Sequence, residues 1–374
     1  MQFRDLKKQY EVLKKDIDAA MIEVASSSKY INGPWVAELE AELAEFVGVK
    51  HCITCANGTD ALTMAMMAWG MGPGDAVFVP DFTFFSSGEI VSHCGATPVF
   101  VDVDRETFNI DCKSLEEAVE AVIANRRLNP KAVVAVDLFG LPADFEAVGK
   151  VADKYGLLVL EDGAQGFGGD IKGKRACSFG DISTTSFFPA KPLGCYGDGG
   201  AVFTDDDETA EILRSIRIHG KGSMKYDNVR IGLNSRLDSM QAAILQVKLK
   251  AFKDYELDDV NGVALMYNKL LSGVVEIPVV PAGFYSSWAQ YTIKLGSEAE
   301  RDGLQAKLKE AGIPSNIYYP KPMHNQLAFE GREEHTECKI TEELCRTVLA
   351  LPIHPYMTEG DVEAVVKVIK GNIK

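Results

Sequence analysis

The sequence lacks several features that would place it in a well-defined class of protein. No cluster of lysine or arginine offsets its formal net charge of −15 at pH 7, which argues against a nucleic-acid-binding surface. No apolar run approaches membrane-spanning length, and the N-terminus has no apolar signal core, which argues against a membrane or exported protein. No compositionally biased tract suggests disorder. We therefore expect a soluble, cytoplasmic protein with no nucleic-acid or membrane partner.

A metal-binding pattern and a dinucleotide fingerprint are missing too. The 8 cysteines are scattered along the chain. The one close pair, Cys52 and Cys55, lies in a predicted strand, where alternation sends the two side chains to opposite faces. No second pair of cysteine or histidine follows at zinc spacing, so we expect free thiols and no metal site. No G-x-G-x-x-G follows the first strand, which argues against a dinucleotide-dependent oxidoreductase.

The chain has 374 residues, enough for a large domain and a smaller one. Short apolar strands first alternate with helices, which predicts right-handed crossovers and a mostly parallel sheet. The predicted strands are 51–55, 76–79, 97–101, 132–136, 157–160, 182–186 and 200–204, and the helices are 4–24, 36–46, 59–69, 85–94, 113–124 and 143–154. We expect an α/β fold in which a seven-stranded sheet is sandwiched by helices.

The pattern changes after a long predicted helix at 236–253. The strands and helices that follow are shorter and mixed, which predicts an α+β unit. The strands are expected at 274–277 and 287–294, and the helices at 298–311, 341–350 and 359–370. We therefore expect a large domain over 1–250 and a small C-terminal domain over 251–374.

One lysine stands in an unusual place. Lys191 lies between two predicted strands, in the glycine- and proline-rich segment 186–200, and upstream Asp162 follows the apolar run 157–160. A carboxylate at the end of a buried strand, with a lysine in a loop, suggests pyridoxal 5′-phosphate (PLP). The lysine forms a Schiff base, and the acid keeps the ring nitrogen protonated. Partial burial lowers the pKa of such a lysine in the direction this chemistry needs.

A second strand end fits the phosphate of such a cofactor. Asn57-Gly58-Thr59-Asp60 follows a strand and opens a predicted helix, whose free N–H groups and dipole favour an anion. Thr59 and Asp60 are equally well explained as helix N-caps. Ser186, five residues before Lys191, is a candidate to give the phosphate a hydroxyl.

A third strand end offers aromatic rings. The segment 81–85 follows a predicted strand at the edge where open α/β sheets place ligands, and an aromatic side chain there can stack on a flat heteroaromatic ring. Ordinary core packing is the alternative for at least one of Phe82, Phe84 and Phe85.

These segments together resemble one family. The acidic strand end, the lysine loop and Asn234-Ser235-Arg236 are similar, in that order, to fold-type I PLP enzymes of the DegT/DnrJ-type nucleotide-sugar aminotransferase family. The resemblance extends over nearly the whole chain. The matching segments are 30–34, 57–62, 80–84, 161–165, 186–200, 232–238 and 319–322.

The resemblance implies a role for each site residue. Lys191 would form the imine with the cofactor and move protons, Asp162 would pair with the ring nitrogen, and Gln165 would lie near the ring hydroxyl. Phe84 would stack on the ring. The phosphate would be seated by Gly58, Thr59, Asp60 and Ser186. Asn234 would reach the phosphate of a neighbouring subunit's cofactor, which implies a homodimer with shared active sites.

The resemblance also narrows the substrate. Asn234-Ser235-Arg236 resembles the branch that aminates 3-oxo sugars, and the lysine loop is similar to that of enzymes acting on UDP-2-acetamido-2-deoxy-3-oxo-glucuronate. Those enzymes serve the synthesis of bacterial surface polysaccharide such as lipopolysaccharide. Arg236 would then meet the sugar carboxylate, and pairing of Arg236 with Asp238 or with a dimer partner is the alternative.

The segment 318–320 departs from the family pattern. Close relatives commonly have His-Tyr-Pro where this chain has Tyr318-Tyr319-Pro320. We take Tyr318 and Tyr319 as candidate substrate-binding residues. His324 is a further candidate, and an exposed loop histidine is the alternative.

The resemblance therefore implies transfer of an amino group from L-glutamate to the C3 ketone of a nucleotide-linked sugar. The alternatives are a 4-oxo-sugar or dTDP-3-oxo-deoxysugar aminotransferase, and a non-catalytic PLP-binding regulatory protein. A PLP-dependent sugar dehydratase of this fold would have histidine in place of Lys191.

Overall fold

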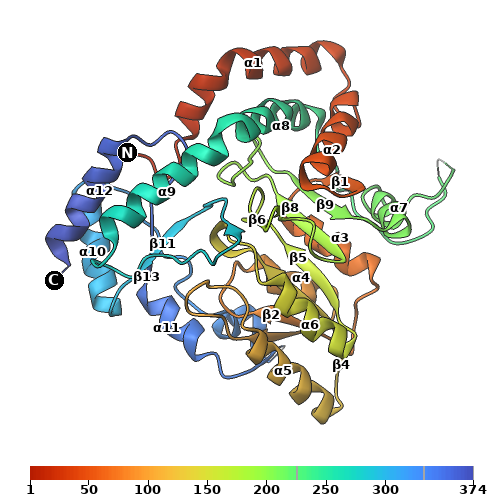
Figure 1. Ribbon diagram of the computed structural model, residues 1–374. Coiled ribbons are helices and arrows are strands. Elements are labelled where there is room, and N and C mark those ends of the chain that lie inside the picture. The colour runs from red at the N-terminus through yellow and green to blue at the C-terminus, as the bar shows by residue number, and fades with distance from the viewer. Residues whose placement is uncertain (225, 332, 374) are drawn as a thin grey trace.

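The computed structural model describes residues 1–224, 226–331 and 333–373 (Figure 1). Within these residues, the centre is an eight-stranded sheet in the order β1-β9-β8-β5-β4-β2-β3-β12. The strands are β1 (His51–Cys55), β2 (Asp75–Pro80), β3 (Thr97–Val101), β4 (Asn129–Val136), β5 (Leu158–Asp162), β8 (Ile182–Ser186), β9 (Gly200–Thr204) and β12 (Glu334–His335).

The sheet is mostly parallel, as predicted. β9 is antiparallel to both of its neighbours, and the other pairs are parallel. All seven predicted strands belong to it. The prediction of seven strands falls short by β12, which has two polar residues and no apolar pattern to reveal it.

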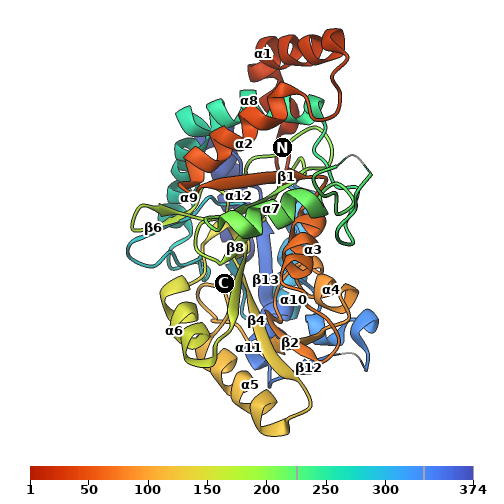
Figure 2. The same cartoon turned by 90° about the vertical axis from the view of Figure 1, so that its right-hand side faces the viewer.

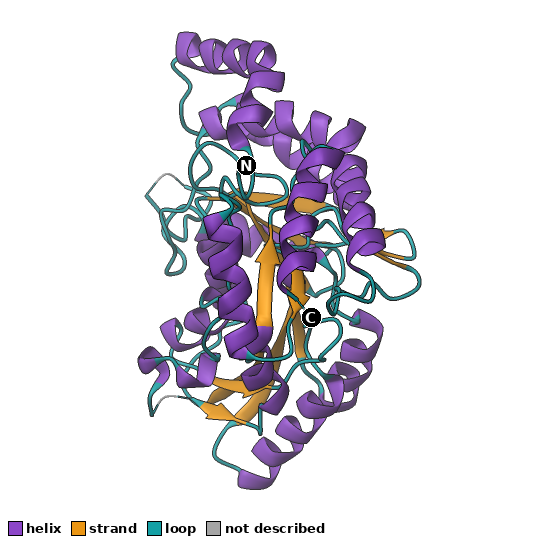
Figure 3. Cartoon of the chain, turned by 90° about the vertical axis from the view of Figure 1, so that its left-hand side faces the viewer, coloured by secondary structure: helices purple, strands orange, loops and turns teal. Residues whose placement is uncertain are grey.

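Helices cover both faces of the sheet (Figure 2). Successive side chains of a strand point to opposite faces, so in β2 Val77 belongs to one core and Phe78 to the other. The first core is closed by α3 (Gly58–Ala68), α4 (Ser86–His93) and α7 (Asp207–Ile216), and the second by α5 (Cys112–Asn125) and α6 (Phe145–Tyr155). Figure 3, coloured by secondary structure, shows the strands with helices on both sides of them.

The same alternation separates the paired cysteines. Cys52 packs in a core with α2 (Pro34–Val47), whereas Cys55 packs in the core under α3. All eight cysteines are free. The predictions of opposite faces and of free thiols are therefore confirmed.

A continuous helical run slopes through the upper left of the molecule in Figure 1. It comprises α8 (Ser239–Ala251), a π-helical turn (Phe252–Glu256) and α9 (Leu257–Leu271). The helix predicted to end at 253 thus continues to 271, because apolar residues on its buried side recur past that point. α1 (Leu6–Ser27) and α2 pack against α8. The domain division at 250/251 stays a prediction, and it would fall inside this run.

The C-terminal part has its own core and a small sheet. β11 (Tyr291–Lys294) pairs antiparallel with β13 (Val348–Leu351), and α9, α10 (Glu298–Glu310) and α12 (Glu359–Asn372) pack against it. The helix predicted at 341–350 is wrong at its end, because α11 (Lys339–Thr347) stops where residues 348–351 join the sheet. No described helix is both long and apolar enough to cross a bilayer.

The segment predicted as a strand at 274–277 has a single bridge instead, from Glu276 to Lys294. A three-stranded sheet of β6 (Asp170–Ile171), β7 (Lys174–Arg175) and β10 (Phe284–Tyr285) links the two parts of the chain.

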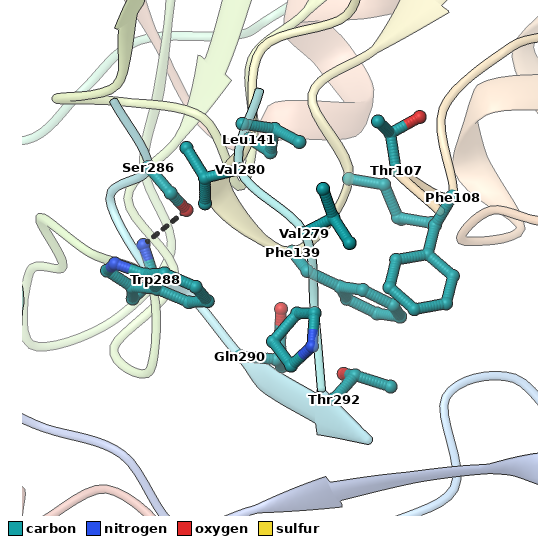
Figure 4. A pocket seen from close by; sticks show the side chains of 12 residues that line it. Thr107, Phe108, Phe139, Leu141, Val279, Val280, Ser286, Trp288, Gln290 and Thr292 are labelled. Atoms are coloured by element: carbon teal, nitrogen blue, oxygen red, sulfur yellow. Dashed lines mark hydrogen bonds between the residues drawn. The ribbon is translucent and has the colours of Figure 1, made fainter. Parts of the chain in front are cut away.

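A small pocket lies where the large sheet meets the C-terminal part (Figure 4). Phe108 and Phe139 line it from loops of the large sheet, and Trp288 and Gln290 line it from the segment that leads into β11. The Gln290 N–H donates to the Phe139 carbonyl over 3.2 Å. Phe108, Phe139 and Trp288 all have positive φ, at 66°, 58° and 50°, a conformation that is uncommon for bulky residues. The junction therefore fixes the backbone around Phe139.

Candidate active site

The candidate site lies at one edge of the large sheet. β4, β5 and β8 are parallel, and β1 runs the same way as β8 because each is antiparallel to β9. Their carboxyl ends therefore meet at one edge, where ligands of open α/β sheets bind. The residues at or just beyond these strand ends include Asn57, Asp137, Asp162 and Ser186.

The start of α3 lies directly against the end of β8 and the start of β9. A β-carbon on Gly58 would be 2.7 Å from the Ser186 β-carbon, and one on Gly200 would be 2.6 Å from the Asn57 carbonyl carbon. The Thr59 hydroxyl lies 2.8 Å from the Ser86 hydroxyl. The structure thus brings Gly58, Thr59 and Ser186 together at a helix N-terminus, which favours an anion.

The N-cap of α3 is Asn57, so the interpretation of Thr59 or Asp60 as the cap is wrong. The Asn57 Oδ1 accepts a hydrogen bond of 2.8 Å from the Asp60 N–H. Asn57 has extended backbone geometry before the first helical residue, which is the arrangement a side-chain cap needs. The Asp60 N–H is therefore committed to the cap, whereas Gly58 and Thr59 precede it in the first turn.

Asp162 is a buried carboxylate at the end of β5, with 5 % of its surface exposed. Its Oδ2 accepts a hydrogen bond of 2.8 Å from the Ser87 hydroxyl, and its Oδ1 accepts one of 3.2 Å from the Ala164 N–H. Burial raises the pKa of Asp162 above its usual value, while these two donors and the nearby Lys191 ammonium oppose that rise. A bound cation would hold this group ionised.

Lys191 is half-buried in the loop between β8 and β9. Burial lowers its pKa from 10.5 to about 8, and the positive charge of Arg4 acts in the same direction, while Asp162 opposes both. Part of the Lys191 population is therefore an uncharged amine near neutral pH. Lys191 and Asp162, which the sequence pattern assigns to the same cofactor, thus interact electrostatically.

The loop that bears Lys191 is held from several sides. The Arg4 guanidinium donates to the Pro192 carbonyl over 3.2 Å, and the buried Lys248 ammonium donates to the Gly194 carbonyl. The Gln241 amide accepts from the Tyr196 N–H at 2.8 Å and donates to the Tyr196 carbonyl at 3.2 Å. These contacts from the N-terminal segment and from α8 fix the loop backbone.

Aromatic residues form one wall of the site. Phe84 is 54 % exposed, whereas Phe82 is buried, so core packing is the right interpretation for Phe82. The Tyr319 ring lies 6.4 Å from the Phe84 ring. Gln165 connects this wall to the sheet, because its Nε2 donates to the Tyr319 hydroxyl at 3.2 Å and its Oε1 accepts from the Phe139 N–H at 2.9 Å.

Tyr318 and His324 lie beside this wall. Tyr318 is half-buried, with its ring 6.2 Å from that of Phe3. The His324 side chain is 10 % exposed and its Nδ1 lies 2.6 Å from Asp81 Oδ2, so the interpretation as an exposed loop histidine is wrong. Asp81 raises the pKa of His324. The Cys338 thiol lies near this pair, within 4.8 Å of both groups.

Asn234 and Arg236 form a local pair in the segment before α8. The Arg236 guanidinium donates to Asn234 Oδ1 over 2.5 Å, so its contact within the chain is with Asn234 and not with Asp238, the alternative that the sequence left open. Between them, Ser235 is fully buried and its hydroxyl accepts a hydrogen bond of 3.0 Å from the Ala56 N–H. The segment is therefore anchored next to the start of α3.

Sequence reasoning missed Ser87, Arg4 and Lys248. Ser87 lies two residues beyond the aromatic segment 81–85, and a hydroxyl in the first turn of a helix at a ligand edge was the available signal. Arg4 and Lys248 reach the lysine loop from 188 and 54 residues away. No local pattern predicts such contacts.

The sheet is mostly parallel and covered on both faces, and its carboxyl edge bears a buried carboxylate and a half-buried lysine. These features define the class of protein. The fold is that of fold-type I PLP-dependent transferases. The chain belongs to the DegT/DnrJ/EryC1/StrS aminotransferase family, whose model matches residues 11–370. The predicted family and enzyme class are therefore confirmed.

Individual relatives are similar over the whole chain. The chain is 43% identical over 366 residues to the UDP-2-acetamido-2-deoxy-3-oxo-D-glucuronate aminotransferase of Pseudomonas aeruginosa, covering 98% of each chain. It is also 43% identical to a pleiotropic regulatory protein of Geobacillus stearothermophilus, covering 98% of this chain and 96% of that one. The crystal structure of a DegT/DnrJ/EryC1/StrS aminotransferase from Brucella abortus superposes with a TM-score of 0.97 and 48% identity, covering 99% of each chain.

Proposed function

We propose that this chain is a PLP-dependent aminotransferase that moves an amino group from L-glutamate to the C3 ketone of a nucleotide-linked sugar. The proposed substrate is UDP-2-acetamido-2-deoxy-3-oxo-glucuronate or a similar 3-oxo sugar. The observation that carries the proposal is the presence, at one edge of the sheet, of the buried Asp162 and of Lys191, whose charges interact, while burial lowers the pKa of the lysine to about 8. The likeness to the Pseudomonas aeruginosa enzyme supports the choice of sugar.

The residues at the sheet edge fit the proposed cofactor. When bound, PLP supplies an electron sink for the carbon that gains or loses the amino group. The phosphate would be held by Gly58, Thr59 and Ser186, where a β-carbon on Gly58 would lie 2.7 Å from the Ser186 β-carbon, so that position has no room for a side chain. Asp60 belongs to the same turn, and its carboxylate lies in the first turn of α3.

Each remaining residue has a proposed task. Lys191 takes up a proton as an uncharged amine and returns it as an ammonium, and Asp162 stabilises a proton on the ring nitrogen through its negative charge. Phe84 offers an exposed ring face for stacking, and Gln165 presents its amide near the ring hydroxyl. The hydrogen bond that the Ser87 hydroxyl donates to Asp162 and the one that the Gln165 amide donates to the Tyr319 hydroxyl hold Asp162 and Gln165 in place.

The sugar would be recognised by a guanidinium and two phenols. Arg236 is the proposed partner of a C6 carboxylate, because its planar fork matches that group. Tyr318 and Tyr319 are the proposed partners of sugar hydroxyls. His324 would contact the substrate through Nε2, since its Nδ1 is held by Asp81.

We propose a homodimer with shared active sites as the active unit. Apolar side chains are exposed on the loop that projects after α7 in Figure 1, among them Met224 at 68% and Ile231 at 84%, and Phe188 beside the lysine loop is 52% exposed. Burying such a surface against a second copy is the usual outcome. Asn234 follows this loop and would reach the partner's cofactor phosphate.

Mixing two inactive variants tests the shared site. If Asn234 serves the neighbouring subunit, hybrids of Lys191→Ala and Asn234→Ala subunits contain one site with both residues intact and regain activity. If Asn234 serves its own subunit, every site in the hybrid lacks one residue and the mixture stays inactive.

The proposed setting is the cytoplasmic synthesis of precursors for a surface polysaccharide such as lipopolysaccharide. A regulatory protein is the second candidate, because one relative of equal identity bears that name. The presence of both Lys191 and Asp162 favours catalysis, since a protein that only binds PLP could do without one of the two groups.

The deciding experiment runs the reaction backward. Protein reconstituted with PLP is mixed with 2-oxoglutarate and either a 3-amino or a 4-amino nucleotide sugar, in UDP and dTDP forms, and glutamate is measured. We expect glutamate from the 3-amino UDP sugar. A response to 4-amino sugars alone contradicts amination at C3. No glutamate from any donor, or full activity of Lys191→Ala, contradicts the proposed function itself.

A further inference from the structure

Three buried carboxyl groups lie at or behind the candidate site. Asp137 follows β4, while Glu161 and Asp162 end β5, and their side chains are 0%, 0% and 5% exposed. Alternation along β5 sends Glu161 and Asp162 to opposite faces. The Asp137 N–H donates to the Asp162 carbonyl over 3.1 Å, so Asp137 is tied to the residue that would serve the ring nitrogen.

The donors around these groups are divided unequally. Glu161 accepts three hydrogen bonds, from Cys177 N–H at 2.5 Å, Phe179 N–H at 2.7 Å and the Ser183 hydroxyl at 2.7 Å. Asp137 Oδ1 accepts one, from Ala143 N–H at 3.0 Å. Among the described residues, Asp137 Oδ2 has no donor. Burying a carboxylate oxygen without a hydrogen-bond donor costs free energy, whereas a protonated carboxyl has an O–H that can itself donate a hydrogen bond.

We propose that Asp137 is a protonated carboxylic acid at neutral pH, that it donates its proton to Glu161, and that it acts as a positioning residue for Asp162. The two buried side chains lie close enough that each perturbs the pKa of the other. Burial and the charge of Glu161 raise the pKa of Asp137, in keeping with this assignment. The titratable groups that face Asp137 are Glu161 and Asp162 from β5 and Cys177 from the loop before β8.

The proton matters for Asp162 because of charge. If Asp137 and Glu161 were both ionised, two negative charges would lie behind Asp162 and would favour its protonation. With one proton shared between them, the pair holds a single charge. Only this consequence for Asp162 rests on the proposed function. The protonation of Asp137 does not.

Asp137 also supports the turn that follows β5. A β-carbon on Gly166 would lie 2.3 Å from Asp137 Oδ2, and one on Gly163 would lie 3.5 Å from it. The Asp137 carboxyl is therefore packed under the turn 163–166, which bears Gln165. A neutral group in this place fixes the turn without adding a second charge to it.

Infrared spectra of the cofactor-free protein test the proton directly. At pH 7, we expect wild type to show a carboxylic acid C=O band. Asp137→Asn should lose this band because it has no carboxyl group at this position, and it should keep the local structure because the asparagine amide can still donate to Glu161. Asp153→Asn, which removes an exposed carboxyl from α6, is the control and should alter carboxylate bands alone. If Asp137→Asn also alters carboxylate bands alone, Asp137 is ionised and the proposal is wrong.

The pH dependence of unfolding gives a second readout. A carboxyl protonated in the folded state loses its proton on unfolding above about pH 4, so stability falls as pH rises. The ratio of the wild-type to the Asp137→Asn unfolding constant should then increase about tenfold per pH unit up to the folded pKa. A ratio that is flat above about pH 5 overturns the assignment.

Cofactor binding tests the positioning role. Asp137→Asn should keep the pH at which the absorbance of bound PLP titrates, whereas Asp137→Leu, which cannot donate to Glu161, should shift it. Equal behaviour of the two variants refutes the role. If Asp137→Leu does not fold, Asp137→Asn decides by itself. A shift in the pH at which its bound PLP titrates refutes the positioning role, and an unchanged pH supports it. If wild type binds no PLP, the proposed function fails, while the infrared and unfolding results still decide the protonation.

Discussion

Gly58 lies so close to Ser186 that a β-carbon on it would be 2.7 Å from the Ser186 β-carbon. This contact places a helix N-terminus next to a strand end. Together they form the proposed binding site for the cofactor phosphate, called the phosphate seat below. Real β-carbons do not approach this closely, so the position requires glycine, although its φ is not in the left-handed region.

We expect Gly58→Ala to lose PLP binding and to destabilise the protein by about 1–3 kcal/mol, because overpacking forces the backbone apart. The measurements are titration with PLP and denaturant unfolding. The control is Gly149→Ala in α6, where a β-carbon meets nothing within 4 Å and helix propensity predicts a gain of about 0.5–1 kcal/mol. Wild-type PLP affinity in Gly58→Ala would contradict the proposed seat.

The lowered pKa of Lys191 predicts that this lysine destabilises the folded, cofactor-free protein. Below pH 8 the folded protein holds a half-buried ammonium, so Lys191→Met should be more stable than wild type by up to about 3 kcal/mol at pH 7. Between about pH 8 and 10.5 the unfolded chain binds more protons than the folded one, so wild-type stability rises and the difference closes. Denaturant unfolding across this range checks the prediction. A difference that does not change with pH would argue against it.

Ser87 should influence Asp162 without touching substrate. Ser87→Ala removes a hydrogen bond of 2.8 Å to the carboxylate, which raises the pKa of Asp162 further, and hydrogen bonds to charged groups contribute about 1.5–3 kcal/mol. We expect kcat to fall about ten- to a hundredfold and the acid limb of the pH profile to move to higher pH. Ser92→Ala, in the same helix, should leave both unchanged. An unshifted acid limb in Ser87→Ala would show that the hydrogen bond has no effect on Asp162.

Gln241 should stiffen the lysine loop. Gln241→Leu leaves the Tyr196 N–H and carbonyl without their side-chain partner, at a cost of about 1–3 kcal/mol. We expect faster amide hydrogen exchange over residues 191–197 and a slower reaction of Lys191 with PLP. Gln246→Leu, on the same helix, is the control, because its amide contacts Glu42 and should affect neither. Unchanged exchange in Gln241→Leu would show that other contacts suffice.

Arg236 should distinguish sugars by charge. If it pairs with a C6 carboxylate, Arg236→Ala should raise KM about ten- to a hundredfold for a 3-oxo glucuronate, since charge-assisted hydrogen bonds contribute about 1.5–3 kcal/mol. The KM for the corresponding sugar without a carboxylate should hardly change. Steady-state kinetics with both substrates decide the matter, and an equal rise for both would assign Arg236 to another part of the substrate or to the dimer.

The positions of seven of the strands in the large sheet, and the placement of Asp162 and Lys191 at its edge, could be predicted from sequence. Strands buried on both faces read as apolar runs, and Asp162 and Lys191 stand out because charged residues are rare at such places. Helix ends were less predictable. α11 stops at Thr347 because the next four residues pair with β11, a long-range interaction that local propensity does not contain.

The partners of the site residues could not be predicted for the same reason. Ser87 meets Asp162 because the first turn of α4 lies next to the end of β5, and Arg4 meets Pro192 because the N-terminal segment lies against the lysine loop. His324 looks like a loop residue in the sequence, yet Asp81 draws it into the protein. Such contacts depend on how elements far apart in the chain are brought together.

The pairing of β1 with β9 has a consequence for synthesis. The two strands are neighbours in the sheet although about 150 residues separate them. At about 5–20 residues per second, β1 leaves the ribosome roughly ten to thirty seconds before its partner exists. During that time its apolar edge is open to other chains. The phosphate seat, which needs Gly58, Ser186 and Gly200 together, can form only after that delay, and a chain that is released before β9 exposes an unpaired strand to chaperones and proteases.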